Sequence, residues 1–157
     1  MNAYFNGEHK DFERVAIVDV DGRTVKSLRQ ALEQLCGLVE DIYKAQVNDV
    51  HLYNHDGTGA HLSLDYSLDP GDVYNQMESV SLAQTKSKGA DDISLRIWQF
   101  NNVVSPAQAT VALGMVIDAM KDFDDKYYLD MTSSCALLEE SIFSLEVRLY
   151  ISPNLKA

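Results

Sequence analysis

Cysteine, proline and glycine are scarce in this chain, with 2 Cys, 3 Pro and 8 Gly among 157 residues. Cys36 and Cys135 form no Cys-x-x-Cys pair, which excludes a disulfide scaffold and a cysteine-rich zinc site. Few Pro and Gly together with 46% hydrophobic residues indicate a globular rather than a disordered protein. A chain of this length buries about 70% of its unfolded surface in one core. We therefore predict a single domain over 1–157, with no metal and no cofactor.

Long apolar runs are also missing. No segment approaches the roughly 18 apolar residues that cross a bilayer. The first ten residues, MNAYFNGEHK, lack the positively charged start and the apolar stretch of a signal peptide. These absences predict a cytoplasmic protein that does not bind membranes.

Basic residues are few: 13 Lys and Arg against 24 Asp and Glu give a formal charge of −11. The negative electrostatic potential that this charge produces repels nucleic-acid phosphates and anionic lipids and favours basic partners. An acidic surface that only keeps the protein in solution is the alternative explanation. The usual glycine-rich nucleotide signatures and the G-x-S-x-G and H-E-x-x-H motifs do not occur.

The first half of the chain reads as strand, helix and hairpin. Residues 15–20 are mostly β-branched and end at the turn signal Asp21-Gly22. Apolar residues at spacings of three and four predict a helix from a Thr24 cap to about Ala45. Two alternating runs around residues 56–59 predict an antiparallel hairpin with Leu52 opposite Leu62.

The second half repeats this order after an ambiguous stretch. Residues 72–88 are interpreted as a short helix, although a loop is the alternative. Residues 92–100 alternate as a strand, and Ser105-Pro106-Ala107-Gln108 predicts a capped helix that ends near Asp124. Residues 127–133 and 142–151 are the last two predicted strands.

The repeated order β-α-β-β predicts an α+β two-layer sandwich, ferredoxin-like in style, with subunits of the repeat at about 13–69 and 91–153. Because each half closes on a hairpin, the sheet should be largely antiparallel, with both helices on one face. The other face would be open. We place on it five candidate binding residues: His51, Tyr53, His61, Trp98 and Tyr150.

A second candidate site is the segment Asp19-Val20-Asp21-Gly22. It resembles the first motif, D-x-D-G-T, of the haloacid-dehalogenase-like phosphatases, with Arg23 in place of the threonine. The resemblance implies Asp19 as nucleophile, Asp21 as acid/base and a Mg²⁺ ion, and it implies a parallel doubly wound sheet. An ordinary strand–turn–helix junction explains the same residues. Two hairpin histidines, His51 and His61, are alternative acid–base groups.

The end of the third predicted helix is the most acidic stretch, through Asp118, Asp122, Asp124 and Asp125. Taken together, the sequence favours a non-catalytic interaction module that engages a basic protein or associates with itself as a dimer. Toxin-neutralising immunity proteins and inhibitors have this size and charge. This comparison is an analogy between classes of protein and rests on no sequence motif. A small enzyme or ligand binder is the competing hypothesis.

Overall fold

The fold repeats one five-element unit. The computed structural model describes residues 2–8, 13–42, 45–54, 59–68, 81–89, 94–101, 103, 105–138 and 142–156. The first unit contains β1 (Asn2–Glu8), β2 (Glu13–Asp21), α1 (Val25–Val39), β3 (Ala45–Asn54) and β4 (Gly59–Leu68). The second contains β5 (Ser81–Gly89), β6 (Ser94–Asn101), α2 (Pro106–Met120) with the short 3₁₀ helix η1 (Lys121–Phe123), β7 (Lys126–Leu138) and β8 (Ile142–Lys156).

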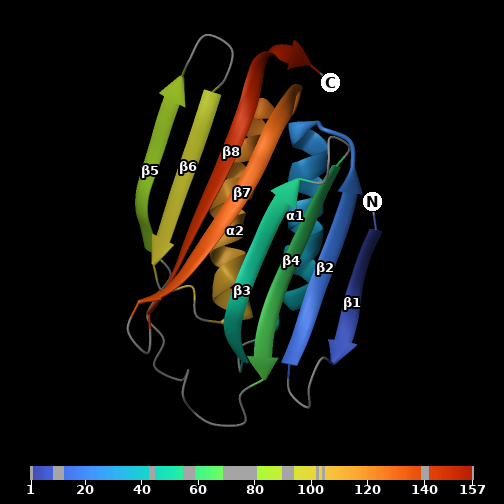
Figure 1. The fold of residues 1–157 in the computed structure, drawn as a ribbon, viewed down its shortest axis with the longest axis vertical. Coiled ribbons are helices and arrows are strands. Elements are labelled where there is room, and N and C mark those ends of the chain that lie inside the picture. Colours follow the sequence, from blue (N-terminus) through green and yellow to red (C-terminus); the bar gives the residue numbers. More distant parts are fainter. Residues whose placement is uncertain are drawn as a thin grey trace.

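Each unit forms a four-stranded antiparallel sheet with the same strand order. The orders are β1-β2-β4-β3 and β5-β6-β8-β7. The two sheets lie edge to edge, with β3 beside β7 at the centre and β1 and β5 at the outer edges (Figure 1). The predicted internal repeat is therefore present, with one more strand at the start of each unit.

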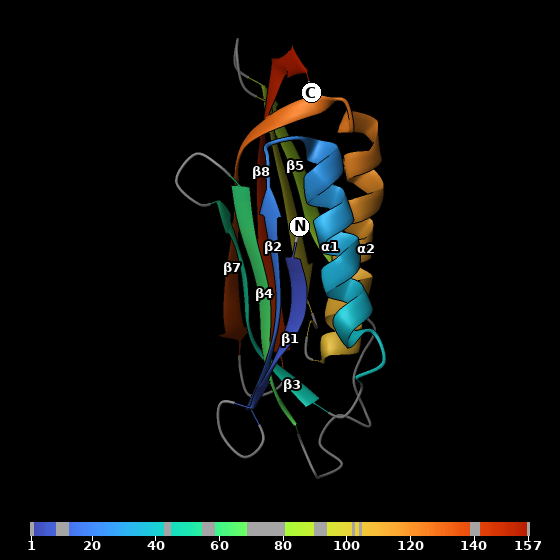
Figure 2. The same ribbon diagram turned by 90° about the vertical axis from the view of Figure 1, so that its right-hand side faces the viewer.

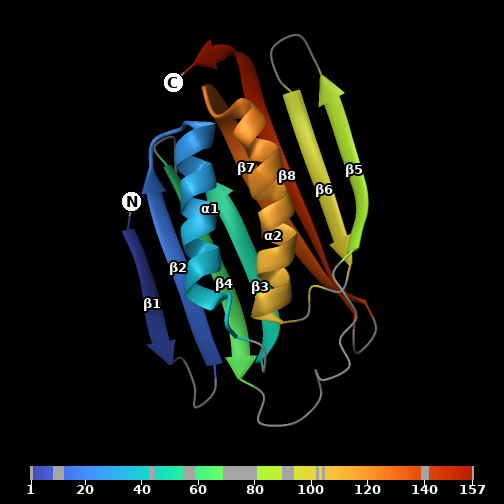
Figure 3. The same cartoon turned by 180° about the vertical axis from the view of Figure 1, so that it is seen from behind.

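Both helices cover the same face of the two sheets, and no helix of the described residues lies on the opposite face (Figure 2). They lie side by side and run in opposite directions (Figure 3). Accordingly, the Ala107 amide at the start of α2 donates to the carbonyl of Ile42, just beyond α1. The predicted two-layer α+β sandwich is confirmed. Among the residues described, no helix has the length and apolar character needed to span a membrane.

The helix starts follow from their capping residues. The Thr24 side chain accepts a hydrogen bond from the Ser27 amide at 3.0 Å. Ser105 and Gln108 form the predicted reciprocal capping box. The predicted end of α1 near Ala45 is wrong, because the helix stops at Val39 and Ala45 begins β3.

Two strands were not predicted. Ser81–Gly89 is the edge strand β5, so the helix interpretation of 72–88 is wrong for this part, and 69–80 lie outside the described residues. The sequence SLAQTKSKG has little β-branched content and alternates poorly. Pairing with β6 gives this segment its extended form. The other strand missing from the prediction, β1, occupies the corresponding edge of the first unit.

The seam between β3 and β7 is bridged by side chains. The Ser133 hydroxyl accepts from the Leu52 amide at 2.9 Å and donates to the Val50 carbonyl at 2.8 Å. Asn54 Nδ2 donates to the Leu129 carbonyl at 3.1 Å. Beneath this seam, buried side chains of both units form one hydrophobic cluster. The open faces of the two sheets consequently form one continuous surface.

Candidate functional site: the open sheet face

The open face consists of the side chains that point away from α1 and α2. The hairpin register places Leu52 opposite Leu62, as predicted, and both residues are buried under the helices. His51, Tyr53 and His61 consequently point to the open face, where 46% of Tyr53 is exposed. Strand pairing therefore gives this surface three of the five residues predicted for it in one group.

One cross-strand row brings together residues from both candidate sites. Asp19 on β2 is paired with His61 on β4, which is paired with Tyr53 on β3. His61 Nδ1 lies 2.6 Å from Asp19 Oδ1, and the rings of His61 and Tyr53 are 5.1 Å apart. The carboxylate thereby holds the imidazole in one orientation. Asp21 lies exposed at the end of the same strand.

The second unit carries a corresponding row. Gln99 on β6 is paired with Glu146 on β8, which is paired with Ser134 on β7. Gln99 Nε2 donates to Glu146 Oε1 at 2.6 Å, at the position where the first unit has the contact between Asp19 and His61. Arg148 Nε donates to the other oxygen of Glu146 at 2.8 Å. Each row thus contains one residue from each of three neighbouring strands, with a polar contact between its first two residues.

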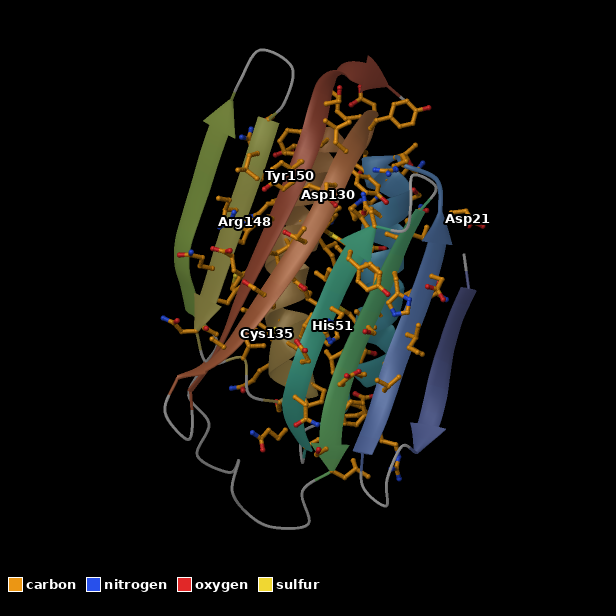
Figure 4. The ribbon with its side chains drawn as sticks, viewed as in Figure 1. Asp21, His51, Asp130, Cys135, Arg148 and Tyr150 are labelled. Carbon is orange, nitrogen blue, oxygen red and sulfur yellow. The ribbon has the colours of Figure 1, made fainter. Side chains whose placement is uncertain are left out.

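The two remaining predicted aromatic residues differ in position. Tyr150 lies on the open face opposite Asp130 of β7 (Figure 4). Trp98 does not lie there, because it is 4% exposed and belongs to the buried cluster. Strand β6 has apolar residues on both of its faces, and Ile97 takes the open-face position, 6% exposed. The prediction that Trp98 belongs to the binding face is therefore wrong.

Carboxylates outnumber cationic groups among the described side chains of the open face. Asp49 faces Asp65 directly across β3 and β4, and Asp49 Oδ2 lies 2.8 Å from His51 Nε2. Among the described side chains, register and alternation place six carboxylates and one cationic side chain, Arg148, on this face. The six are Asp19, Asp21, Asp49, Asp65, Asp130 and Glu146. With the histidines neutral, these seven described side chains contribute a formal charge of −5.

The acidic helix end lies in the helix layer. Asp124 makes a two-pronged contact with Arg29 of α1, at 2.9 and 2.8 Å. Asp118 lies 3.2 Å from Lys121, while Asp122 and Asp125 are exposed. Two of the four predicted carboxylates consequently have cationic neighbours within the molecule.

The architecture contradicts what the phosphatase resemblance implies, because the sheets are antiparallel and Asp19 pairs with His61. In the described part of the chain, no cluster of three His, Cys, Asp or Glu side chains has metal-binding geometry. Burial raises the pKa of both thiols, Cys36 and Cys135, to about 12. This favours packing over nucleophilic roles for the cysteines.

A hollow of about 450 Å³ lies beside the second row, towards the ends of β6 and β7. Its lining includes open-face residues from three strands: Gln99, Asn101, Ser134, Ala136, Ser144 and Glu146. The open face therefore combines a carboxylate-rich surface, exposed tyrosine and a recess. Comparisons of this chain with family models, with curated proteins and with solved structures find no match.

Proposed function

We propose that this protein is a non-catalytic binding module whose open sheet face docks a positively charged protein partner. One observation carries the proposal: a face without covering helices presents six carboxylates and one arginine among its described side chains. Charge of one sign on an accessible surface accelerates encounter with a partner of the opposite sign and excludes partners of the same sign.

The aromatic residues support the same partner chemistry. Tyr53 is 46% exposed and lies in the row with Asp19, and Tyr150 is paired with Asp130. Tyrosine faces attract lysine and arginine through cation–π contacts, each about 0.5–1 kcal/mol at exposed sites. A basic segment that crosses the two sheets would therefore meet carboxylates and aromatic rings together.

A second copy of this chain fits the face less well. Two open faces in contact would bring together the six described carboxylates of each copy, and like-charge juxtaposition costs several kcal/mol. A basic partner therefore ranks ahead of the homodimer.

An acid–base site is the second candidate function, favoured by the 2.6 Å contact between Asp19 and His61. A carboxylate that orients an imidazole is a common arrangement for general-base catalysis. Hydrolysis of an activated ester that is lost in both His61→Gln and Asp19→Asn would support it, whereas no hydrolysis by the native chain would count against it.

The docking proposal is tested by photo-crosslinking followed by reconstitution. A photoreactive residue at Tyr53 should capture a basic protein, whereas the same residue at Val111, exposed on α2, should not. The captured protein is then purified and its affinity measured at two salt concentrations. Asp19→Asn with Asp130→Asn should weaken binding about tenfold.

The matched control changes the same charge in the helix layer, through Asp118→Asn with Asp122→Asn. This control should leave affinity within about twofold, because these side chains lie away from the open face. Capture through Val111, or equal weakening by both double variants, would refute docking on the sheet.

A further inference from the structure

The hollow on the open face arises from small side chains in register. Gln99, Glu146 and Ser134 form one cross-strand row beside it, and the cross-strand pair of Ser144 and Ala136 follows this row. Asn101, two residues beyond Gln99 on β6, completes this part of the lining. On β7 and β8 three of these positions carry Ser or Ala, which leave space above the sheet. Polar side chains on β6 and β8 form its wall.

The corresponding row of the first unit has a large side chain at the position where the hollow lies in the second unit. Asp19 and Gln99 are each two residues from the end of their strand, and their partners His61 and Glu146 occupy the same place in the strand order. The third position holds Tyr53 in the first unit and Ser134 in the second. The recess of about 450 Å³ lies where the repeat would otherwise place a tyrosine side chain.

The lining is rich in hydrogen-bond acceptors. Glu146 contributes a carboxylate whose orientation is fixed by Gln99 Nε2 and Arg148 Nε. Ser134 and Ser144 contribute hydroxyl oxygens, and Asn101 contributes an amide oxygen. The lining also includes apolar side chains, so it matches a ligand group that carries several donors on an alkyl stem.

We infer that this hollow binds an arginine side chain of the basic partner, an inference that rests on the proposed function. A guanidinium has five N–H donors, no acceptor and a permanent charge. Its planar fork pairs with a carboxylate, and arginine is among the residues that dominate binding energy when buried in interface pockets. Arg148 shares Glu146 and therefore competes with the incoming group.

The direct test uses a defined probe, Nα-acetylarginine N-methylamide, titrated into the ¹⁵N-labelled full chain. Amide resonances of Ser134, Ala136 and Ser144 should shift saturably, with a dissociation constant on the order of 1 mM for so small a ligand. The uncharged citrulline analogue should bind at least fivefold more weakly. Equal shifts with both probes, or shifts spread evenly over the face, would overturn the inference.

Variants test whether the probe binds in the hollow or elsewhere on the open face. Ala136→Leu projects three more carbon atoms into the hollow and should weaken the shifts, while Thr132→Leu places the same leucine side chain on the same face of β7, outside the lining, and should preserve them. Arg148→Gln removes the competing guanidinium and should strengthen binding severalfold. Unchanged binding in Ala136→Leu would place the probe elsewhere.

Failure of this inference differs from failure of the docking proposal. If a reconstituted partner binds with the same affinity to Ala136→Leu but loses affinity in the Asp19→Asn and Asp130→Asn variant, docking stands and the arginine anchor is wrong. If the probe occupies the hollow while no basic protein engages the open face, the guanidinium site stands and the docking proposal is wrong.

Discussion

Raising the pH should destabilise this protein through four acidic groups, two buried tyrosines and two partly buried cysteines. Burial raises the pKa of Cys36 and Cys135 from 9.0 to about 12 and that of Tyr66 and Tyr128 from 10.0 to about 12. Each group binds its proton more tightly in the folded chain than in the unfolded chain. Their stabilising effect is therefore complete below pH 9 and decreases between pH 9 and 12.

The magnitude follows from proton linkage. Within its window, each group lowers the free energy of unfolding by about 1.4 kcal/mol per pH unit. For the four groups together the loss by pH 10.5 is at most about 6 kcal/mol, of which the two thiols account for at most about 4 kcal/mol, because solvent screening at partly exposed groups reduces it. A domain of this size is stable by only about 5–15 kcal/mol, so the native state should become marginal near this pH.

The assay is urea unfolding followed by circular dichroism at pH 8, 9.5 and 10.5. The control is Cys36→Ala with Cys135→Ala, which is less stable at pH 8 because packing is lost but should show only about one third of the native chain's pH dependence. Parallel pH profiles for the two proteins would show that the thiols are not buried as the structure places them.

Further predictions concern the seam, the glycines and the core. Ser133→Ala should lower the free energy of unfolding by about 1–3 kcal/mol, because a β3 amide loses its acceptor, whereas the neighbouring Ser134→Ala should cost little. Gly59→Ala should destabilise strongly, because its Cβ would lie 2.0 Å from a main-chain oxygen of β2; Gly37→Ala, in open space on α1, should stabilise by about 0.5–1 kcal/mol. Trp98, 4% exposed, should emit at short wavelength and resist acrylamide quenching in native protein, whereas ready quenching would contradict its burial.

The features that could be predicted from the sequence are those fixed by local patterns. Alternation of Leu52 and Leu62 with polar neighbours specifies the hairpin register, because a slip of one residue would expose the apolar set. Thr24 and Ser105 specify the helix starts, because their side chains satisfy amides within one turn. Because these local signals occur in the same order in both halves of the chain, they were sufficient to predict the two-layer architecture.

Features that depend on contacts between distant segments could not be predicted from the sequence. Leu95, Ile97, Trp98 and Phe100 make both faces of β6 apolar, so alternation could not decide which face the helices cover. The contact between Asp19 and His61 depends on the pairing of β2 with β4, which a helix and a strand separate in the chain. The hollow likewise depends on the register of three strands.

Carboxyl footprinting of the reconstituted complex tests docking on the open face most directly. Carbodiimide coupling labels exposed Asp and Glu side chains, and mass spectrometry measures each site with and without the partner. The account predicts protection of Asp21, Asp130 and Glu146 on binding, with Asp118 and Asp122 labelled as in the free protein. Protection of the helix-layer carboxylates with the sheet carboxylates still labelled would contradict it.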